Sequence, residues 1–171
     1  MVMIACGLLY LRYQYGGLDG AKDWLNGLMK KRAINVALYF TDPDTDSLVP
    51  EQREINDVFS KKQKIAKTID ELIKGPKGNL VHTIPSATRL RNVRIDSDGI
   101  VWLDFDSHLS KDHPGGSSSE IMTVYSIVNT VLLNFKDVAK VKLLIDGAEI
   151  QTLAGHIDCS KPFDAGRDFI K

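Results

Sequence analysis

The sequence has little of several features that mark particular protein classes. Its 171 residues include only two cysteines, Cys6 and Cys159, which cannot supply a disulfide framework or a cysteine-based zinc site. Basic and acidic residues balance at 22 each, so the chain carries no electrostatic footprint for nucleic acid. No apolar run reaches the roughly 20 residues of a membrane-spanning helix. The composition, 43% apolar and 26% charged, is that of one globular domain.

Catalytic and metal-binding motifs are also missing. The signatures of nucleophile elbows, zinc proteases, redox cysteine pairs and dinucleotide sites do not occur. The histidines show no ligand spacing, and His156, Asp158 and Cys159 lack a second, distant pair of donors. Asp104 and Asp106 share one face of a strand end, but no third group accompanies them. The sequence therefore predicts no catalytic residue, no metal and no cofactor.

Two loops resemble ligand sites only in part. Asp42, Asp44 and Asp46 begin like a calcium-binding loop, but Ser47 replaces the required glycine and Arg53 the closing glutamate. This pattern predicts a polar turn.

A second loop, Gly115–Ser119, is rich in glycine and serine but lacks the lysine of a phosphate-binding loop. Ser117 and Glu120 have the spacing of a capping box, so we expect these residues to begin a helix.

The amino-terminal segment, 1–15, leaves three interpretations open. Residues 1–11 are apolar, and Arg12 with two tyrosines follows, as at the outer end of a membrane anchor. The Met-Ile-Ala-Cys stretch ending at Cys6 loosely resembles a lipoprotein signal, although five residues before the cysteine are few. The third interpretation is an apolar strand or helix packed on the domain.

The glycine-bearing stretch 16–32 is interpreted as a tether, residues 33–163 as the folded domain, and residues 164–171 as a tail. In the first half of the domain, residues 33–40 alternate like a strand, and 48–55 form a weaker second strand. Apolar positions spaced near 3.6 predict a helix over 57–74, which Gly75 and Pro76 end.

The second half contains two hairpins and the clearest helix. Residues 88–95 and 100–105 are expected to pair through an Asp-Gly turn, with Trp102 facing away from the core. The helix begins at Ser117 and carries one apolar stripe as far as Phe135, and strands 138–145 and 148–153 follow. We therefore expect a two-layer α+β domain with a largely antiparallel or mixed sheet and both helices on one face.

Several segments, taken in order, resemble the GerMN domain family of bacterial envelope proteins across residues 33–163. The matching pieces are Val36–Glu51, Leu72–Lys77, Thr83–Leu90, Val101–Phe105, Ile145–Glu149 and Gly155–Asp158. The resemblance implies an α+β module similar to the ring-building modules of envelope machines. It also implies export behind a lipoprotein signal or a membrane anchor, which favours the anchor interpretation of residues 1–15.

The same resemblance implies association with other envelope proteins, or self-association, in place of catalysis. A free sheet edge and a solvent-facing Trp102 offer contact surface, and Asp104, His156 and Asp158 join it as candidate partner-binding residues. We expect membrane contact through the amino-terminal segment and no nucleic acid. The alternative is an enzyme acting on cell-wall material, or a peptidoglycan-binding protein, using Asp104, Asp106 or His156.

Overall fold

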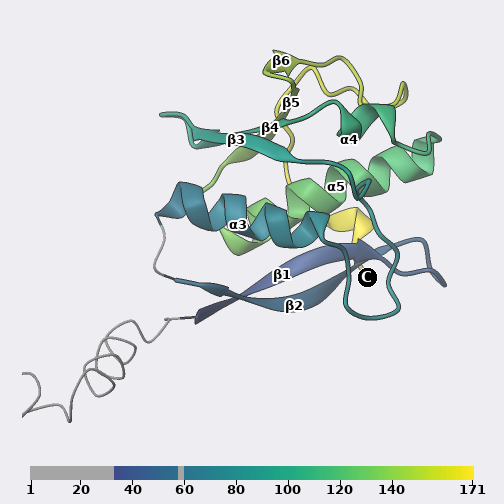
Figure 1. The fold of residues 1–171 in the computed structure, drawn as a ribbon, viewed down its shortest axis with the longest axis horizontal. Helices are drawn as coiled ribbons and strands as arrows, with labels where there is room; N and C mark the ends of the chain where they lie inside the picture. Colours follow the sequence, from purple (N-terminus) through teal and green to yellow (C-terminus); the bar gives the residue numbers. More distant parts are fainter. Residues whose placement is uncertain (1–32, 58–59) are drawn as a thin grey trace, which may run out of the picture. The chain divides into compact units, whose positions relative to one another are not determined.

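The computed structural model describes residues 33–57 and 60–171. The expected anchor and tether, 1–15 and 16–32, lie outside this part, as does Val58 of the first predicted helix. The described chain begins with β1 (Ala33–Thr41) and β2 (Leu48–Asn56), which pair antiparallel as a two-stranded sheet (Figure 1). Val36, Leu38 and Phe40 of β1 are buried on one face, because a strand turns every second residue toward the same side, and Tyr39 is buried on the other face.

The first helix, α3 (Lys61–Ile73), is shorter at its start than the expected 57–74. Ser60 is its N-cap: its hydroxyl accepts the backbone N–H of Gln63, and the Gln63 side chain accepts the N–H of Ser60 at 3.0 Å. This capping box fixes the first turn. At the other end Gly75 follows the last turn with a φ of 86°, in agreement with the predicted stop.

The second sheet is mixed, in the order β3-β4-β5-β6. Strands β3 (Leu90–Ile95) and β4 (Ile100–Phe105) form the expected hairpin, and β5 (Lys140–Ile145) runs parallel to β4. Of the last predicted strand, 148–153, only β6 (Ala148–Glu149) pairs with β5. A short helix that the sequence did not reveal, α4 (His108–Lys111), follows β4.

The long helix α5 (Ser117–Asn134) lies with α3 between the two sheets (Figure 1). The α+β class is confirmed, and both helices cover one face of the four-stranded sheet. The expectation of a single sheet is wrong, because β1 and β2 form a separate layer on the far side of the helices. The reason is that α5 buries two faces: its apolar stripe meets the four-stranded sheet, and a polar stripe of Ser126, Thr130 and Asn134 meets β1.

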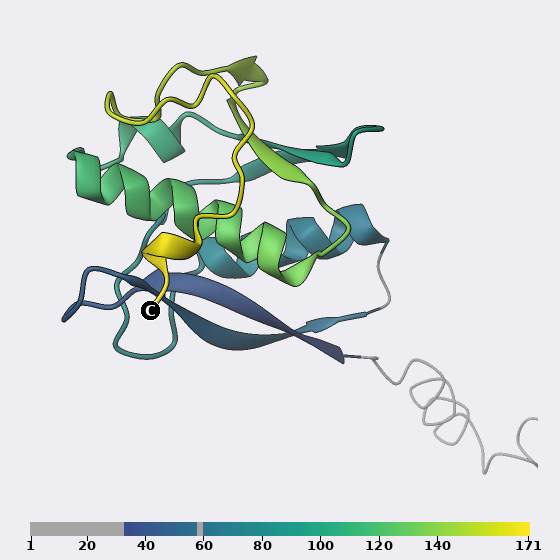
Figure 2. The same ribbon diagram turned by 180° about the vertical axis from the view of Figure 1, so that it is seen from behind.

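Residues 164–171, expected as a tail, lie on the domain. Gly166 exchanges two hydrogen bonds with the Asn129 side chain, at 2.9 and 3.0 Å. The rings of Phe169 and Tyr125 lie 4.3 Å apart, and the Lys171 N–H donates to the Leu48 carbonyl oxygen at 3.1 Å. Figure 2 shows this segment, which includes the 3-10 turn η1 (Arg167–Phe169), crossing α5 toward β1 and β2.

Candidate functional site

The two predicted contact residues on β4 are engaged within the domain. The indole N–H of Trp102 donates to Asp96 Oδ2 at 2.7 Å, and the guanidinium of Arg94 lies 4.3 Å from the centre of its ring. One face of the indole and its single donor are therefore occupied. Asp104 Oδ1 accepts the backbone N–H of Gly147 at 2.7 Å, which fixes the turn between β5 and β6.

The other two predicted residues, His156 and Asp158, lie on the loop that follows β6. Asp158 Oδ1 accepts the backbone N–H of Ser160 at 2.8 Å, so its contact is local. The Nδ1 atom of His156 lies 3.1 Å from Oε2 of Glu120. The four predicted contact residues therefore lie in two places, on β4 and on the loop after β6. Each of them makes a hydrogen bond to another residue of the same domain.

Glu120 has a different role in the structure from the capping role that its spacing to Ser117 predicts. The predicted capping box is wrong, because the N-cap of α5 is Gly116, which has no side chain to accept a backbone N–H. The Glu120 side chain is instead fully buried, and it accepts the backbone N–H groups of Leu153, Ala154 and His156 at 2.8–2.9 Å. Burial alone would raise its pKa, but hydrogen bonds to the charged form outweigh burial and lower it.

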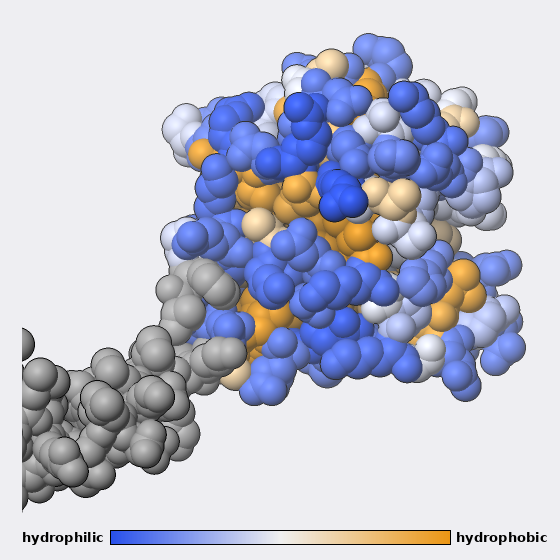
Figure 3. Space-filling view, viewed as in Figure 1, coloured by the Kyte–Doolittle hydropathy of each residue, from blue (hydrophilic) through white to orange (hydrophobic). Residues whose placement is uncertain are grey.

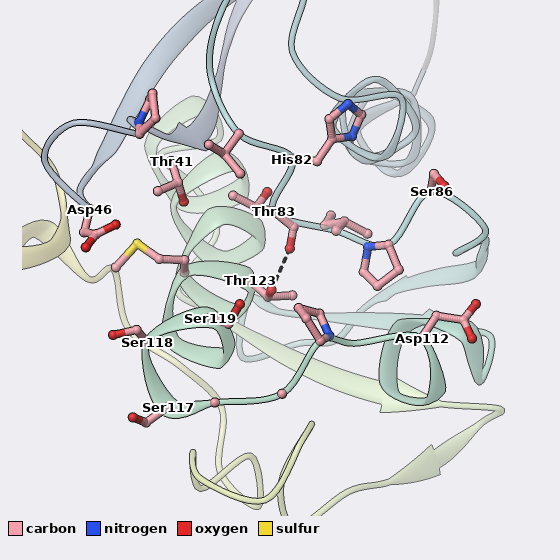
Figure 4. A pocket seen from close by; sticks show the side chains of 18 residues that line it. Thr41, Asp46, His82, Thr83, Ser86, Asp112, Ser117, Ser118, Ser119 and Thr123 are labelled. Atoms are coloured by element: carbon pink, nitrogen blue, oxygen red, sulfur yellow. Dashed lines mark hydrogen bonds between the residues drawn. The ribbon is translucent and has the colours of Figure 1, made fainter.

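A groove of about 960 Å³ lies at the start of α5 (Figure 4). We call it the α5 groove. Three stretches line it: the turn between β1 and β2, the extended segment 81–86, and the loop before α5 together with the first two turns of that helix. These segments are far apart in the sequence, so no local motif could have revealed the groove.

The base of the α5 groove is fixed by hydrogen bonds. Thr123 Oγ1 donates to the Thr83 carbonyl oxygen at 2.6 Å, and the hydroxyls of Thr83 and Ser126 lie 2.6 Å apart. Because Ser126 donates to the Tyr39 carbonyl oxygen at 2.6 Å, it must accept from Thr83. The hydroxyl protons of Thr83, Ser126 and Thr123 therefore each have one assigned acceptor, which fixes the base of the groove.

His113 completes the same network from the loop before α5. Its Nδ1 atom accepts the backbone N–H of Gly115 at 3.0 Å, so its Nε2 atom carries the proton and donates to Thr123 Oγ1 at 3.0 Å. Desolvation lowers the pKa of His113, with partial compensation from the Glu120 charge, and the neutral ring fits these two bonds. His113 is therefore a structural histidine and is not poised as a base.

The charged groups that line the α5 groove are acidic. Among the described residues, Asp46 and Asp112 line it, no lysine or arginine does so, and His82 is the one histidine in the lining. Asp112 also contacts His108 Nδ1 at 2.7 Å on the adjacent α4. Figure 4 shows the two carboxylates at opposite ends of the groove.

A smaller cleft of about 190 Å³ lies between α3 and β3. Ala66, Leu90 and Val93 give it an apolar base, and Figure 3 shows an apolar strip on this face of the molecule. The Lys62 amine reaches across the cleft to Asn92 Oδ1 at 3.1 Å. This contact spans the opening and leaves less free surface than the α5 groove has.

Within residues 33–57 and 60–171, no three His, Cys, Asp or Glu side chains lie close enough together to hold a metal ion. None of the helices that the structure describes combines the length and the apolar character needed to cross a membrane.

Comparison with known proteins identifies the family. The model of the Germane family, described as "Sporulation and spore germination", matches residues 37–151, which is more than half of the chain. The chain belongs to this family. Its matched span runs from β1 through the loop after β6, so it contains both sheets, the α5 groove and Glu120. No curated protein matches the chain.

Solved structures agree with this assignment. A putative lipoprotein from Clostridium perfringens is 28% identical with a TM-score of 0.57, and the match covers 80% of this chain and 89% of that one. The tandem GerMN domains of the sporulation protein GerM from Bacillus subtilis match at 23% identity and a TM-score of 0.60, over 80% of this chain and 47% of that one. The first of those domains alone matches at 21% identity and a TM-score of 0.60, covering 79% and 99%. The resemblance to GerMN domains is thereby confirmed.

Proposed function

We propose that this protein is a non-catalytic module of a bacterial envelope that acts by assembling with other proteins, held at the membrane through residues 1–15. The family description makes sporulation and spore germination the processes in which to look for this role. The likeness to a putative lipoprotein supports an extracytoplasmic, anchored location. Both the membrane anchor and a lipid on Cys6 are compatible with this location.

One observation carries the non-catalytic part of the proposal: the candidate reactive side chains are held in structural contacts. Asp104 binds the Gly147 N–H, and Asp106 binds the Arg89 N–H at 3.1 Å. His156 is bound to Glu120. The thiol of Cys159 is buried, and burial raises its pKa to about 11, so it is not a nucleophile at neutral pH.

Association at a membrane has a physical advantage for such a module. Anchoring confines two partners to one surface, which raises their effective concentration without new contacts. A weak domain interface is then sufficient for assembly.

In-cell crosslinking combined with cell fractionation tests this proposal. The full chain should sediment with membranes and should crosslink to itself or to one neighbour. A variant lacking residues 1–32 is the matched control and should lose most of the crosslinked product. A cytosolic full chain, or equal crosslinking by both proteins, would contradict the role of the anchor.

A wall-degradation assay tests the alternative of a cell-wall enzyme. Purified peptidoglycan incubated with the full chain should release no fragments. Release that Asp104→Ala, Asp106→Ala or His156→Ala abolishes would establish catalysis instead.

A further inference from the structure

We infer that the α5 groove binds an extended, basic polypeptide segment of a partner protein. This inference rests on the proposed role in assembly and names the surface and the chemistry of one contact. It concerns residues that neither the sequence motifs nor the comparisons assign.

The lining of the groove favours a peptide over a sugar. It contains apolar side chains from three prolines and from Val81, Ile84 and Met122. Of the residues that the structure describes, no tryptophan, tyrosine or phenylalanine lines it. Sugars are commonly bound by stacking on aromatic rings, which this groove cannot offer. Val81 is 46% exposed and is the one large apolar side chain, among the described residues, that is left so open to solvent.

The polar groups of the groove fit the backbone of an extended segment. The first turn of α5 has no side-chain cap, so N–H groups of Ser117–Ser119 are available to peptide carbonyl oxygens. The three serine hydroxyls can donate or accept beside them. The network of Thr83, Thr123 and Ser126 fixes the base, so a ligand would meet an ordered surface and lose little affinity to reorganisation.

Charge then selects a basic segment. Asp46 and Asp112 stand at the two ends of the groove (Figure 4), and within 33–57 and 60–171 no lysine or arginine lines it. A free anion would meet these carboxylates and gain no compensating cation, which argues against phosphate at the start of α5. An extended chain with lysine or arginine near both ends would satisfy both carboxylates while its apolar residues cover Val81.

The test measures binding of defined peptides to the full chain by fluorescence anisotropy. The probes are two labelled decapeptides, one alternating lysine with valine and one alternating glutamate with valine, and a soluble peptidoglycan fragment. The lysine peptide should bind about tenfold more tightly than the glutamate peptide and should weaken as salt is raised. Equal binding of both peptides, or binding of the peptidoglycan fragment alone, would overturn the inference.

Variants locate the site. The double change Asp46→Asn and Asp112→Asn should weaken binding of the lysine peptide about three- to tenfold. Asparagine tolerates the positive φ of 49° at position 46, so the turn should survive. Asp98→Asn, an exposed carboxylate on the hairpin between β3 and β4, is the matched control and should bind like the parent. Equal losses in the control and in the double variant would refute the location.

The same variants separate this inference from the proposed function. If the double variant still crosslinks fully in cells, the protein assembles through another surface, and the groove inference fails while the proposed function stands. If the parent does not crosslink at all, the proposed function fails. Peptide binding that then still depends on Asp46 and Asp112 would support the groove as a site on its own.

Discussion

Glu120 holds His156 by two contacts: its Oε2 atom accepts the backbone N–H at 2.8 Å and lies 3.1 Å from the ring Nδ1. Its Oε1 atom accepts the N–H groups of Leu153 and Ala154. One buried carboxylate on α5 therefore organises the loop that contains the Gly-His-x-Asp segment of the family resemblance. This gives that segment a structural explanation in the present chain.

Glu120→Ala should destabilise the domain by about 2–4 kcal/mol, because it leaves three N–H groups without their acceptor in a buried position. Chemical denaturation of the full chain measures the loss. Glu54→Ala, an exposed glutamate on β2, is the matched control and should change the unfolding free energy by less than about 0.5 kcal/mol. A Glu120→Ala protein as stable as this control would show that the loop does not depend on the carboxylate.

Acid should weaken the domain partly through Glu120. Its pKa in the folded state lies below the ordinary value of 4.5, so its ionised form stabilises the fold above that value. This contribution is lost as the pH falls from 4.5 through the lower folded-state pKa. Glu51 and Glu71, which contact Arg53, also have lowered pKa values and act in the same direction.

The measurement is the unfolding free energy between pH 7 and pH 3 for the parent and for Glu120→Gln. The variant should start lower at pH 7 and fall less steeply below pH 4.5, because the amide cannot be protonated there. Parallel curves would mean that Glu120 does not contribute to the acid response.

Local signals in the sequence were sufficient for most elements and insufficient for their arrangement. Period-two and period-3.6 patterns located the strands and both main helices, since each reflects one buried face. They could not show that α5 buries a polar face as well, because Ser126 and Thr130 look like solvent-facing residues until β1 is placed beside them. The α5 groove was missed for the same reason, since its walls come together only in the fold.

The serines that begin α5 illustrate a specific error. The Ser117–Glu120 spacing is a valid capping signal. The Glu120 carboxylate instead accepts three backbone N–H groups of the loop after β6, so it is not available to cap α5. The real capping box, Ser60 with Gln63, lay inside a longer predicted helix. The spacing of a capping box can therefore be recognised in the sequence, but it does not show which of the two helices is capped in this way.

Gly75→Ala should destabilise the domain for two separable reasons. A φ of 86° is strained for alanine, and a Cβ atom there would lie 1.9 Å from Cε1 of His82. The combined cost should exceed about 1 kcal/mol, which is the scale of the backbone effect alone. Thermal unfolding of the full chain would measure it.

His82→Ala in the Gly75→Ala background tests the second reason. It removes the clash and leaves the backbone strain, so the double variant should regain part of the stability lost by the single one. If the double variant is less stable than Gly75→Ala by the full cost of losing His82, the His82 ring moves aside freely in the single variant. The close approach of His82 would then not be the reason that position 75 is a glycine.

The final prediction concerns the edge of β1 that does not pair with β2. Asn134, on the last turn of α5, accepts the Ala37 N–H at 2.8 Å and donates to the Ala37 carbonyl oxygen at 2.7 Å. Thr130 accepts the Tyr39 N–H at 3.1 Å in the same manner. Side chains of a helix thus take the place of a neighbouring strand, and they cover an edge that would otherwise invite pairing with another chain.

Asn134→Ala should therefore have two effects. The domain should lose about 1–3 kcal/mol, since one donor and one acceptor of β1 lose their partner. The variant should also aggregate faster than the parent on mild warming, because the edge at Ala37 becomes open to strand addition. The matched control is Asn92→Ala, at an exposed asparagine on β3 whose side chain accepts a hydrogen bond from Lys62. This change should alter neither the unfolding free energy nor the aggregation rate appreciably. Glu120→Ala, if it is destabilised to a similar extent, serves as a second comparison. If Asn134→Ala aggregates no faster than Glu120→Ala, covering the edge of β1 stabilises the fold but does not protect it against aggregation.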